Sequence, residues 1–355
     1  QHNVNLRGGT EELSYYTSAS YLKKNGLTPS SRLKRYTVRF NLDSRATDWF
    51  HYGVNLGLNY DERKSDRMFG KLYAGNNGAF STVTNKPYIN PYDKNGRKLD
   101  VIPTMNAYNN ELWAKLNPRY TNDARLTGTG FIELTPVKGL TLRSQLGVDA
   151  ADTRSTVIGY PSAPWNDTKD GGFRNEYFSR MSSFTITNTA EYKWELSQDH
   201  QLTFLLGQEG IKSQDFGFNS LTVGQSDDRL IELRHGTKAE LPDLEGHNTV
   251  EYLSFFGRVD YALMNKYFFD VTVRNDRSSR FGANNRSAMF ASGGFMWNMK
   301  REDFLKDIEW LTDLKFKASM GSTGNSQGIS YYDALTKIGQ VLYNGSNGWG
   351  LATPE

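Results

Sequence analysis

The sequence of 355 residues predicts an all-β protein, in which roughly a dozen antiparallel strands form part of the wall of a larger transmembrane β-barrel. Three observations carry this prediction. Apolar and polar residues alternate with a period of two, the connections between the alternating stretches are short and long in turn, and aromatic residues gather beside the short connections. All three are properties of barrels that cross a membrane with tilted strands.

The alternation is repeated many times along the chain. In one instance Val38 and Phe40 flank Arg39, so that apolar side chains share one face and polar side chains share the other. The stretches with this pattern are residues 36–43, 52–61, 140–149, 182–194, 253–261, 267–273 and 314–320. Several strands are expected to exceed ten residues, whereas soluble strands most often have about 5–6 and membrane-spanning strands need about 9–11. Strand length therefore favours a membrane barrel over a soluble sandwich or propeller.

The connections give an independent indication. The short ones are residues 8–11, 43–47, 136–139, 196–200 and 264–266. The long ones are residues 24–32, 63–123, 151–175, 212–246 and 276–286. Outer-membrane barrels have short periplasmic turns and long extracellular loops, so the short connections are assigned to the periplasmic side. This alternation holds to about residue 299.

Aromatic residues cluster at the ends of the short connections. They are Trp49, Tyr52, Tyr192, Trp194, Tyr261, Tyr267 and Trp297. Amphipathic rings prefer the boundary between membrane and water, which predicts a periplasmic aromatic girdle. The alternative is ordinary cross-strand packing of aromatic side chains.

Two short helices are predicted among the connections. Residues 302–311 place Phe304, Ile308 and Leu311 at helical spacing, and this amphipathic segment is expected to cap the periplasmic rim. A second short helix is expected around residues 110–116, within the longest loop.

Composition argues against several functional classes. Lys and Arg together number 42 and Asp and Glu number 39, so the net charge of +3 does not favour a nucleic-acid partner. The chain has no cysteine and only five scattered histidines, so neither a metal site nor a cofactor is expected. There is no Gly-x-Ser-x-Gly elbow and no phosphate-cradling loop, and the chain is not expected to be an enzyme.

Several ordered motifs resemble those of one family. Residues 273–282, Val-Arg-Asn-Asp-Arg-Ser-Ser-Arg-Phe-Gly, resemble a strand-and-loop signature of SusC/RagA-like TonB-linked outer-membrane proteins. The other segments that resemble the family, at family-like spacing, are residues 2–17, 21–26, 297, 301–305, 310–325 and 352–355. The resemblance covers most strands but not the long loops.

The resemblance implies both a domain organisation and a function. Residues 1–355 would be part of the receptor's β-barrel domain, while the plug domain and later barrel strands would lie outside this chain. The whole protein would import a bulky nutrient, a glycan or a peptide, across the outer membrane of a Gram-negative bacterium. Its partners would be a SusD-like surface lipoprotein, the TonB complex through the plug region, and the lipid bilayer.

Other readings stay open at this stage. A plugged receptor for an iron chelate or cobalamin would share the barrel, as would a passive or structural outer-membrane barrel. A soluble structural or adhesion β-protein is an alternative from a different class. It requires the apolar faces to be buried against a second layer of protein.

Two sets of residues are candidates for contact with cargo. The polar face of the strands is expected to line the lumen, and its members are Arg39, Asn41, Asn55, Asn59, Arg143, Gln145, Glu191, Arg258, Asp260, Asp270, Thr272 and Arg274. Among loop aromatics, the candidates for ligand binding are Trp349, Trp165 and Trp113, because an aromatic face suits stacking on a sugar or gripping a lid protein. Plain loop packing is the alternative for each of them.

Overall fold

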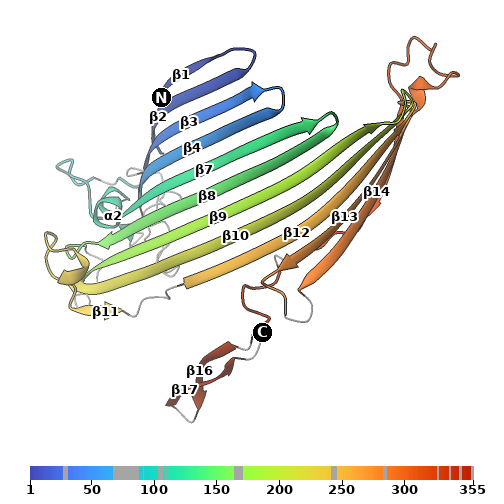
Figure 1. The fold of residues 1–355 in the computed structure, drawn as a ribbon. Coiled ribbons are helices and arrows are strands. Elements are labelled where there is room, and N and C mark those ends of the chain that lie inside the picture. Colours follow the sequence, from blue (N-terminus) through green and yellow to red (C-terminus); the bar gives the residue numbers. More distant parts are fainter. Residues whose placement is uncertain are drawn as a thin grey trace.

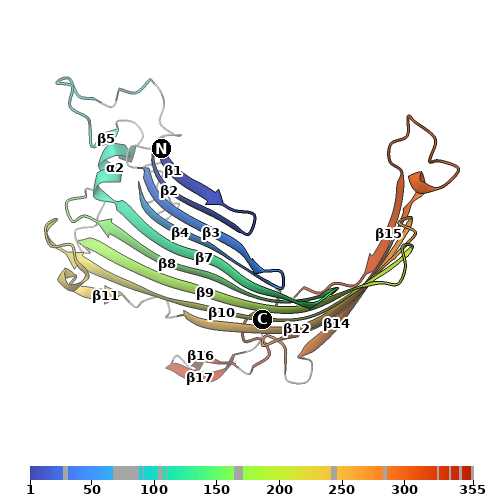
Figure 2. The same ribbon diagram turned by 45° about the horizontal axis from the view of Figure 1, so that its top comes forward.

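The computed structural model describes residues 1–26, 31–66, 88–90, 92–102, 107–108, 110–163, 171–240, 246–282, 286–325, 328–335, 337–343 and 346–352. Most of these residues belong to one 13-stranded antiparallel sheet. The sheet is a single curved layer of long, tilted strands, as Figures 1 and 2 show, and its strand order does not close on itself. This confirms the predicted all-β barrel wall of about a dozen strands.

The twelve long strands of the sheet pair in chain order, as in an up-and-down barrel. The strands, in spatial order, are β1 (His2–Gly9), β2 (Leu13–Asn25), β3 (Arg32–Thr47), β4 (Phe50–Asp66), β7 (Pro118–Val137), β8 (Leu140–Gly159), β9 (Gly172–Glu195), β10 (His200–Gln225), β12 (Gly246–Leu263), β13 (Tyr267–Ser278), β14 (Ser287–Asn298) and β15 (Lys315–Gly321). The short β11 (Lys238–Glu240) pairs with the outer end of β10. Two separate hairpins are β5 (Val101–Ile102) with β6 (Ala107–Tyr108), and β16 (Lys337–Tyr343) with β17 (Ser346–Ala352). In the sequence, β5 and β6 lie between β4 and β7, and β11 lies between β10 and β12.

The predicted bounds of two long loops were wrong. Strands β8, β9 and β10 have 20, 24 and 26 residues, well beyond what a bilayer needs, so they continue into segments predicted as loops at 151–175 and 212–246. Polar side chains interrupt the hydrophobic period there. Arg180 and Asp152, for example, form a cross-strand ion pair at 2.6 Å on the otherwise apolar face. The backbone hydrogen bonds between these strands therefore continue beyond the point where the alternation of apolar residues ends in the sequence.

The apolar face of the sheet is open. Large side chains on it are widely exposed, including Leu58 (51%), Leu206 (68%) and Val271 (56%). Among the described residues, buried apolar side chains are few, and they belong to α2 (Asn110–Leu116), to the ends of β8 and β12 and to the segment after β8. None of the elements that the structure describes forms a second layer over this face, and its exposed apolar side chains fit contact with hydrocarbon.

Aromatic side chains mark both boundaries of the apolar belt. Beside the short connections, Trp49 and Trp194 are about half exposed, and the rings of Tyr267 and Trp297 stack at 6.2 Å. Towards the other end, the rings of Tyr21, Tyr36 and Tyr60 form a ladder across β2, β3 and β4 on the same face. The two groups correspond to the aromatic girdles of a membrane barrel.

One polar strip crosses the apolar belt. Ser144, Asn188 and Gln208 lie side by side on β8, β9 and β10, between apolar rows on either side. The Ser144 hydroxyl donates to Asn188 Oδ1 at 2.7 Å, and Asn188 Nδ2 donates to Gln208 Oε1 at 2.8 Å. Because hydrocarbon offers no water, these mutual hydrogen bonds offset the cost of placing polar groups there.

The predicted helix at residues 302–311 was wrong, whereas the one at 110–116 is confirmed as α2 (Asn110–Leu116). The first segment is a chain of turns that follows η2 (Met299–Arg301). The ammonium group of Lys300 donates to the carbonyl oxygens of Leu305, Lys306 and Ile308 at 2.7–3.0 Å. Carbonyl groups that converge on one cation cannot also point along a common helix axis. No helix of the described residues is long and apolar enough to cross a membrane.

A charge on the apolar face should disturb folding more than the same charge on the polar face. Leu56 is 41% exposed on the apolar face, while Asn55 lies on the polar face with Nδ2 3.4 Å from Thr129 Oγ1. Leu56→Arg in the full-length protein is expected to cost about 2–4 kcal/mol, the cost of an arginine near the bilayer midplane. Asn55→Arg should cost clearly less. Urea unfolding in lipid vesicles measures both, and equal losses would contradict the assignment of the faces.

The polar strip gives a second prediction. Asn188→Leu leaves Ser144 and Gln208 without their partner in hydrocarbon and should destabilise the barrel by about 1–3 kcal/mol. A triple variant, Ser144→Ala with Asn188→Leu and Gln208→Leu, makes the strip apolar and should regain most of that loss. The same unfolding assay compares them. If the triple variant is less stable than Asn188→Leu, the three polar side chains must contribute more than their mutual hydrogen bonds.

Candidate functional site

The polar face of the sheet carries a series of cross-strand ion pairs. At the outer end of β3, β4 and β7, Asp61 accepts from Arg35 at 2.8 Å and from Arg63 at 2.9 Å, and Arg63 lies 3.2 Å from Asp123. The Asp61 side chain is only 6% exposed, so its charge requires these partners. The network holds three strands together on the face assigned to the barrel interior.

Further pairs continue along the same face. They are Arg125–Asp149 (2.6 Å), Arg143–Glu133 (3.2 Å), Arg258–Asp260 (2.6 Å) and Arg274–Glu209 (2.8 Å). Every cation in this set is an arginine, whose planar fork can bond a carboxylate and still present donors to a neighbour. These pairs make the interior wall polar and able to hydrogen-bond a polar partner.

The twelve residues predicted for the interior share this face. The register pairs Asn41 with Asn55, Arg258 with Thr272, and Asp260 with Asp270. The alternation placed Asp61 on the polar face, but the residues named for the interior did not include Asp61 or Glu209, two of the carboxylates that hold arginines in place. The usable signal was charge complementarity between neighbouring strands, for example Arg35 directly opposite Asp61.

A pocket of about 330 Å³ opens on the polar face between β12, β13, β14 and the segment that follows β15. Its lining includes Tyr252, Phe281, Phe290, Arg274, Asp276 and Asn325. Arg274 bonds Glu209 and Asp276 and lies 5.5 Å from the centre of the Phe256 ring. An apolar hollow beside a fixed charged pair can bind an amphipathic part of a substrate.

The chain after β15 folds back over the outer end of the interior face. The Tyr331 hydroxyl donates to Asp215 at 2.9 Å, and the Tyr332 hydroxyl donates to the carbonyl of His247 at 3.1 Å. The Arg280 guanidinium lies 4.7 Å from the centre of the Tyr331 ring. The hydrogen bond to the Asp215 carboxylate, which favours the protonated hydroxyl, raises the pKa of Tyr331. These contacts fix residues 328–335 beside the pocket.

A second cluster of polar contacts, centred on Glu302, lies at the periplasmic rim. Glu302 accepts from the Tyr267 hydroxyl at 2.7 Å, from Lys266 Nζ at 2.9 Å and from Trp297 Nε1 at 3.0 Å. These three donors, with that of Tyr267 foremost, lower the pKa of Glu302 to about 2. The carboxylate thus links the β12–β13 turn to the segment after β14, and the girdle aromatics act as its donors.

The three aromatic residues predicted to bind ligand differ in location and in exposure. Trp113 lies in α2 and is 8% exposed, so its ring packs within the loop. Trp349 lies in β17 and is 74% exposed. Trp165 lies outside the described residues. The structure does not bring Trp113 and Trp349 into one site, and ligand binding by the three residues stays a prediction.

The single-layer sheet, its apolar face, its polar interior and its two aromatic girdles define the class of protein: an outer-membrane-type β-barrel wall. No family model matches the chain. Among curated proteins, it is 28% identical to the TonB-dependent receptor SusC of Bacteroides thetaiotaomicron and to the TonB-dependent receptor P3 of Formosa agariphila, over 91% and 94% of this chain. The chain spans about one third of each of these relatives (33%).

Solved structures agree. A structure of the RagAB peptide transporter matches 99% of this chain at 35% identity with a TM-score of 0.88, and the match covers 40% of that chain. The ferric-catecholate receptor Fiu of E. coli matches at 8% identity with a TM-score of 0.51, which shows a shared fold alone. This chain belongs to the barrel of the SusC/RagA-like TonB-dependent receptors.

The Glu302 cluster predicts a pH dependence of stability. Because the pKa of Glu302 is lowered in the folded state, its stabilising effect is fully present above its ordinary pKa of 4.5 and is lost as the pH falls towards about 2. Between these values the wild-type receptor should lose thermal stability more steeply than Glu302→Gln. Thermal unfolding in detergent at pH 7, 4 and 2.5 measures this. Parallel pH profiles would contradict the proposed role of the carboxylate.

Proposed function

We propose that the receptor containing this chain imports a bulky nutrient, a glycan or a peptide, across the outer membrane. The observation that carries the proposal is the match to the RagAB peptide transporter over 99% of the chain at 35% identity. The similarity to SusC and other TonB-dependent receptors supports energisation by TonB and capture together with a SusD-like surface lipoprotein. Residues 1–355 would then contribute barrel wall, while a plug domain and further strands belong to the rest of the receptor.

The task of the chain itself is physical rather than catalytic. The named relatives are receptors and transporters. The ion-paired interior offers oriented donors and acceptors to a plug or a passing cargo, and the pocket beside Arg274 adds an apolar contact.

The main alternative is a receptor for an iron chelate. Siderophore receptors such as Fiu share the fold, but at 8% identity they do not extend the likeness to function. A passive barrel is the second alternative. TonB dependence separates it from the proposal, since a passive channel needs no energy from the inner membrane.

Transport assays test the proposal directly. Cells expressing the full-length receptor should take up labelled oligosaccharide or oligopeptide only when TonB is present, and a SusD-like lipoprotein should copurify in detergent. Uptake that persists without TonB would favour a passive barrel. Uptake restricted to ferric chelates would favour the siderophore alternative.

The pocket can be tested in the same assay. Arg274→Gln removes a charged hydrogen-bond donor from the pocket and should lower uptake roughly tenfold at equal surface expression. Arg229→Gln is the matched control, because Arg229 pairs with Asp227 in an external loop away from the interior face. Equal uptake by the two variants would show that Arg274 does not contact the cargo during transport.

A further inference from the structure

A groove of about 590 Å³ lies on the apolar, membrane-facing side of the sheet. Its floor is one cross-strand row in which Gly210 on β10 lies between Ile186 on β9 and Leu253 on β12. Leu146 continues the row beyond Ile186. A glycine between two large aliphatic residues leaves a gap in the apolar surface, which we call the Gly210 groove. A Cβ added at Gly210 would make only ordinary contacts, with Ile186 Cγ2 at 3.4 Å and Gln208 Nε2 at 3.9 Å.

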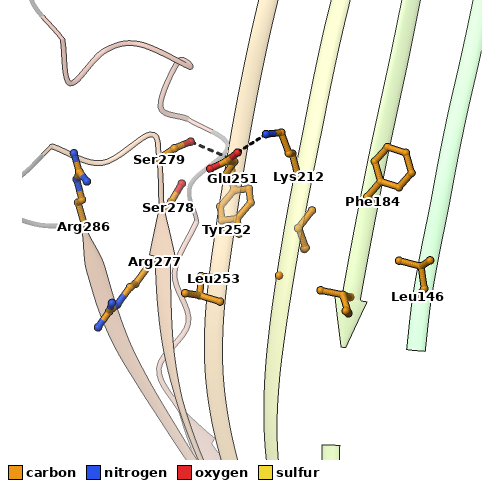
Figure 3. Close-up of a pocket in the computed structure, with 13 residues that line it drawn as sticks. Leu146, Phe184, Lys212, Glu251, Tyr252, Leu253, Arg277, Ser278, Ser279 and Arg286 are labelled. Atoms are coloured by element: carbon orange, nitrogen blue, oxygen red, sulfur yellow. Dashed lines mark hydrogen bonds and ion pairs between the residues drawn. The ribbon is translucent and has the colours of Figure 1, made fainter. Parts of the chain in front are cut away.

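The outer end of the groove is polar. In the next row towards the extracellular side, Lys212 pairs with Glu251 at 2.8 Å, and the Ser279 hydroxyl accepts from the backbone N–H of Glu251 at 3.0 Å. Figure 3 shows these contacts together with two arginines that line the groove: Arg277, opposite Leu253 in the floor row, and Arg286, whose carbonyl oxygen accepts from the backbone N–H of Ser278. The groove therefore combines an aliphatic floor with cationic side chains at its β13 edge and at its outer end.

The two arginines differ from other cations on the same face. Lys34 and Arg180, near the outer ends of β3 and β9, pair with Glu62 and Asp152 at 2.6 Å each. Arg277 and Arg286 are exposed, and neither forms an ion pair with any residue that the structure describes. Two uncompensated guanidinium groups at the edge of a hydrocarbon belt suit an anion that the protein does not supply.

We propose that the Gly210 groove binds a phosphate-bearing, acylated lipid of the outer leaflet. An acyl chain would lie over Gly210 between Ile186 and Leu253, where the missing side chain leaves room for it. The phosphate would accept hydrogen bonds from Arg277 and Arg286, which offer the planar forks that match phosphate oxygens. The Lys212–Glu251 pair is already neutral and borders the headgroup. This site lies on the opposite face of the sheet from the interior pocket and does not depend on the transported cargo.

Native mass spectrometry of the full-length receptor in detergent tests the proposal, with monophosphoryl lipid A as the probe. The wild type should retain this lipid, whereas fully dephosphorylated lipid A and inorganic phosphate should bind at least tenfold more weakly. The double variant Arg277→Gln/Arg286→Gln should lose binding roughly 25-fold, about fivefold for each cation removed. Gly210→Leu fills the floor with an apolar side chain that hydrocarbon tolerates, and it should weaken binding without any change in charge.

A matched control removes two positive charges elsewhere. Lys34→Gln/Arg229→Gln should bind the lipid as the wild type does, because both residues lie outside the groove and are already paired. Thermal unfolding confirms that every variant is folded. Unchanged lipid binding by the Arg277/Arg286 variant would overturn the proposal. So would equal binding of dephosphorylated lipid, or binding of inorganic phosphate as tight as that of the lipid.

Discussion

Everything in this structure depends on one constraint: a single layer of backbone must lie between hydrocarbon and a polar interior. In lipid each backbone N–H and C=O has to find its partner within the protein, and an antiparallel ladder provides these partners strand by strand. Between β1 and β15 the described sheet meets this constraint strand by strand, with shifts of register only at three strand ends and with the outer edges of β1 and β15 left open. The side chains then only have to differ between the two faces, which explains why period two is visible throughout the sequence.

The two faces solve the problem of polarity in different ways. On the interior face, arginines and carboxylates pair across strands, so that Asp61 keeps its charge although it is nearly inaccessible. On the outer face, polar groups within the belt bond to one another, as Ser144, Asn188 and Gln208 do. The Gly210 groove departs from both patterns, because its arginines lack protein partners among the described residues. Unpaired donors at a lipid boundary are the reason to assign a lipid to that site.

Strand positions, chain direction and the facing of side chains could be predicted from the sequence, because each depends on local alternation. The outer limits of β8 and β10 could not, since residues such as Asp152 and Arg180 end the apolar signal while their ion pair keeps the ladder intact. The helix expected at 302–311 failed for a tertiary reason, the convergence of three carbonyl groups on Lys300. The Glu302 cluster and the interior pocket were equally invisible, because they join residues that register and turns bring together.

The contact of the apolar face with hydrocarbon is tested most directly by site-directed spin labelling of the full-length receptor in lipid vesicles. Single cysteines would be placed in turn along β4 and β9, in a chain that contains no cysteine of its own. The account predicts that accessibility to oxygen, which dissolves in lipid, peaks at every second residue, starting with Leu56 and Ile186. Accessibility to a water-soluble nickel chelate should not peak at these positions. If labels at these positions are shielded from oxygen, as they would be under a second protein layer, the apolar face does not contact hydrocarbon and the account is contradicted.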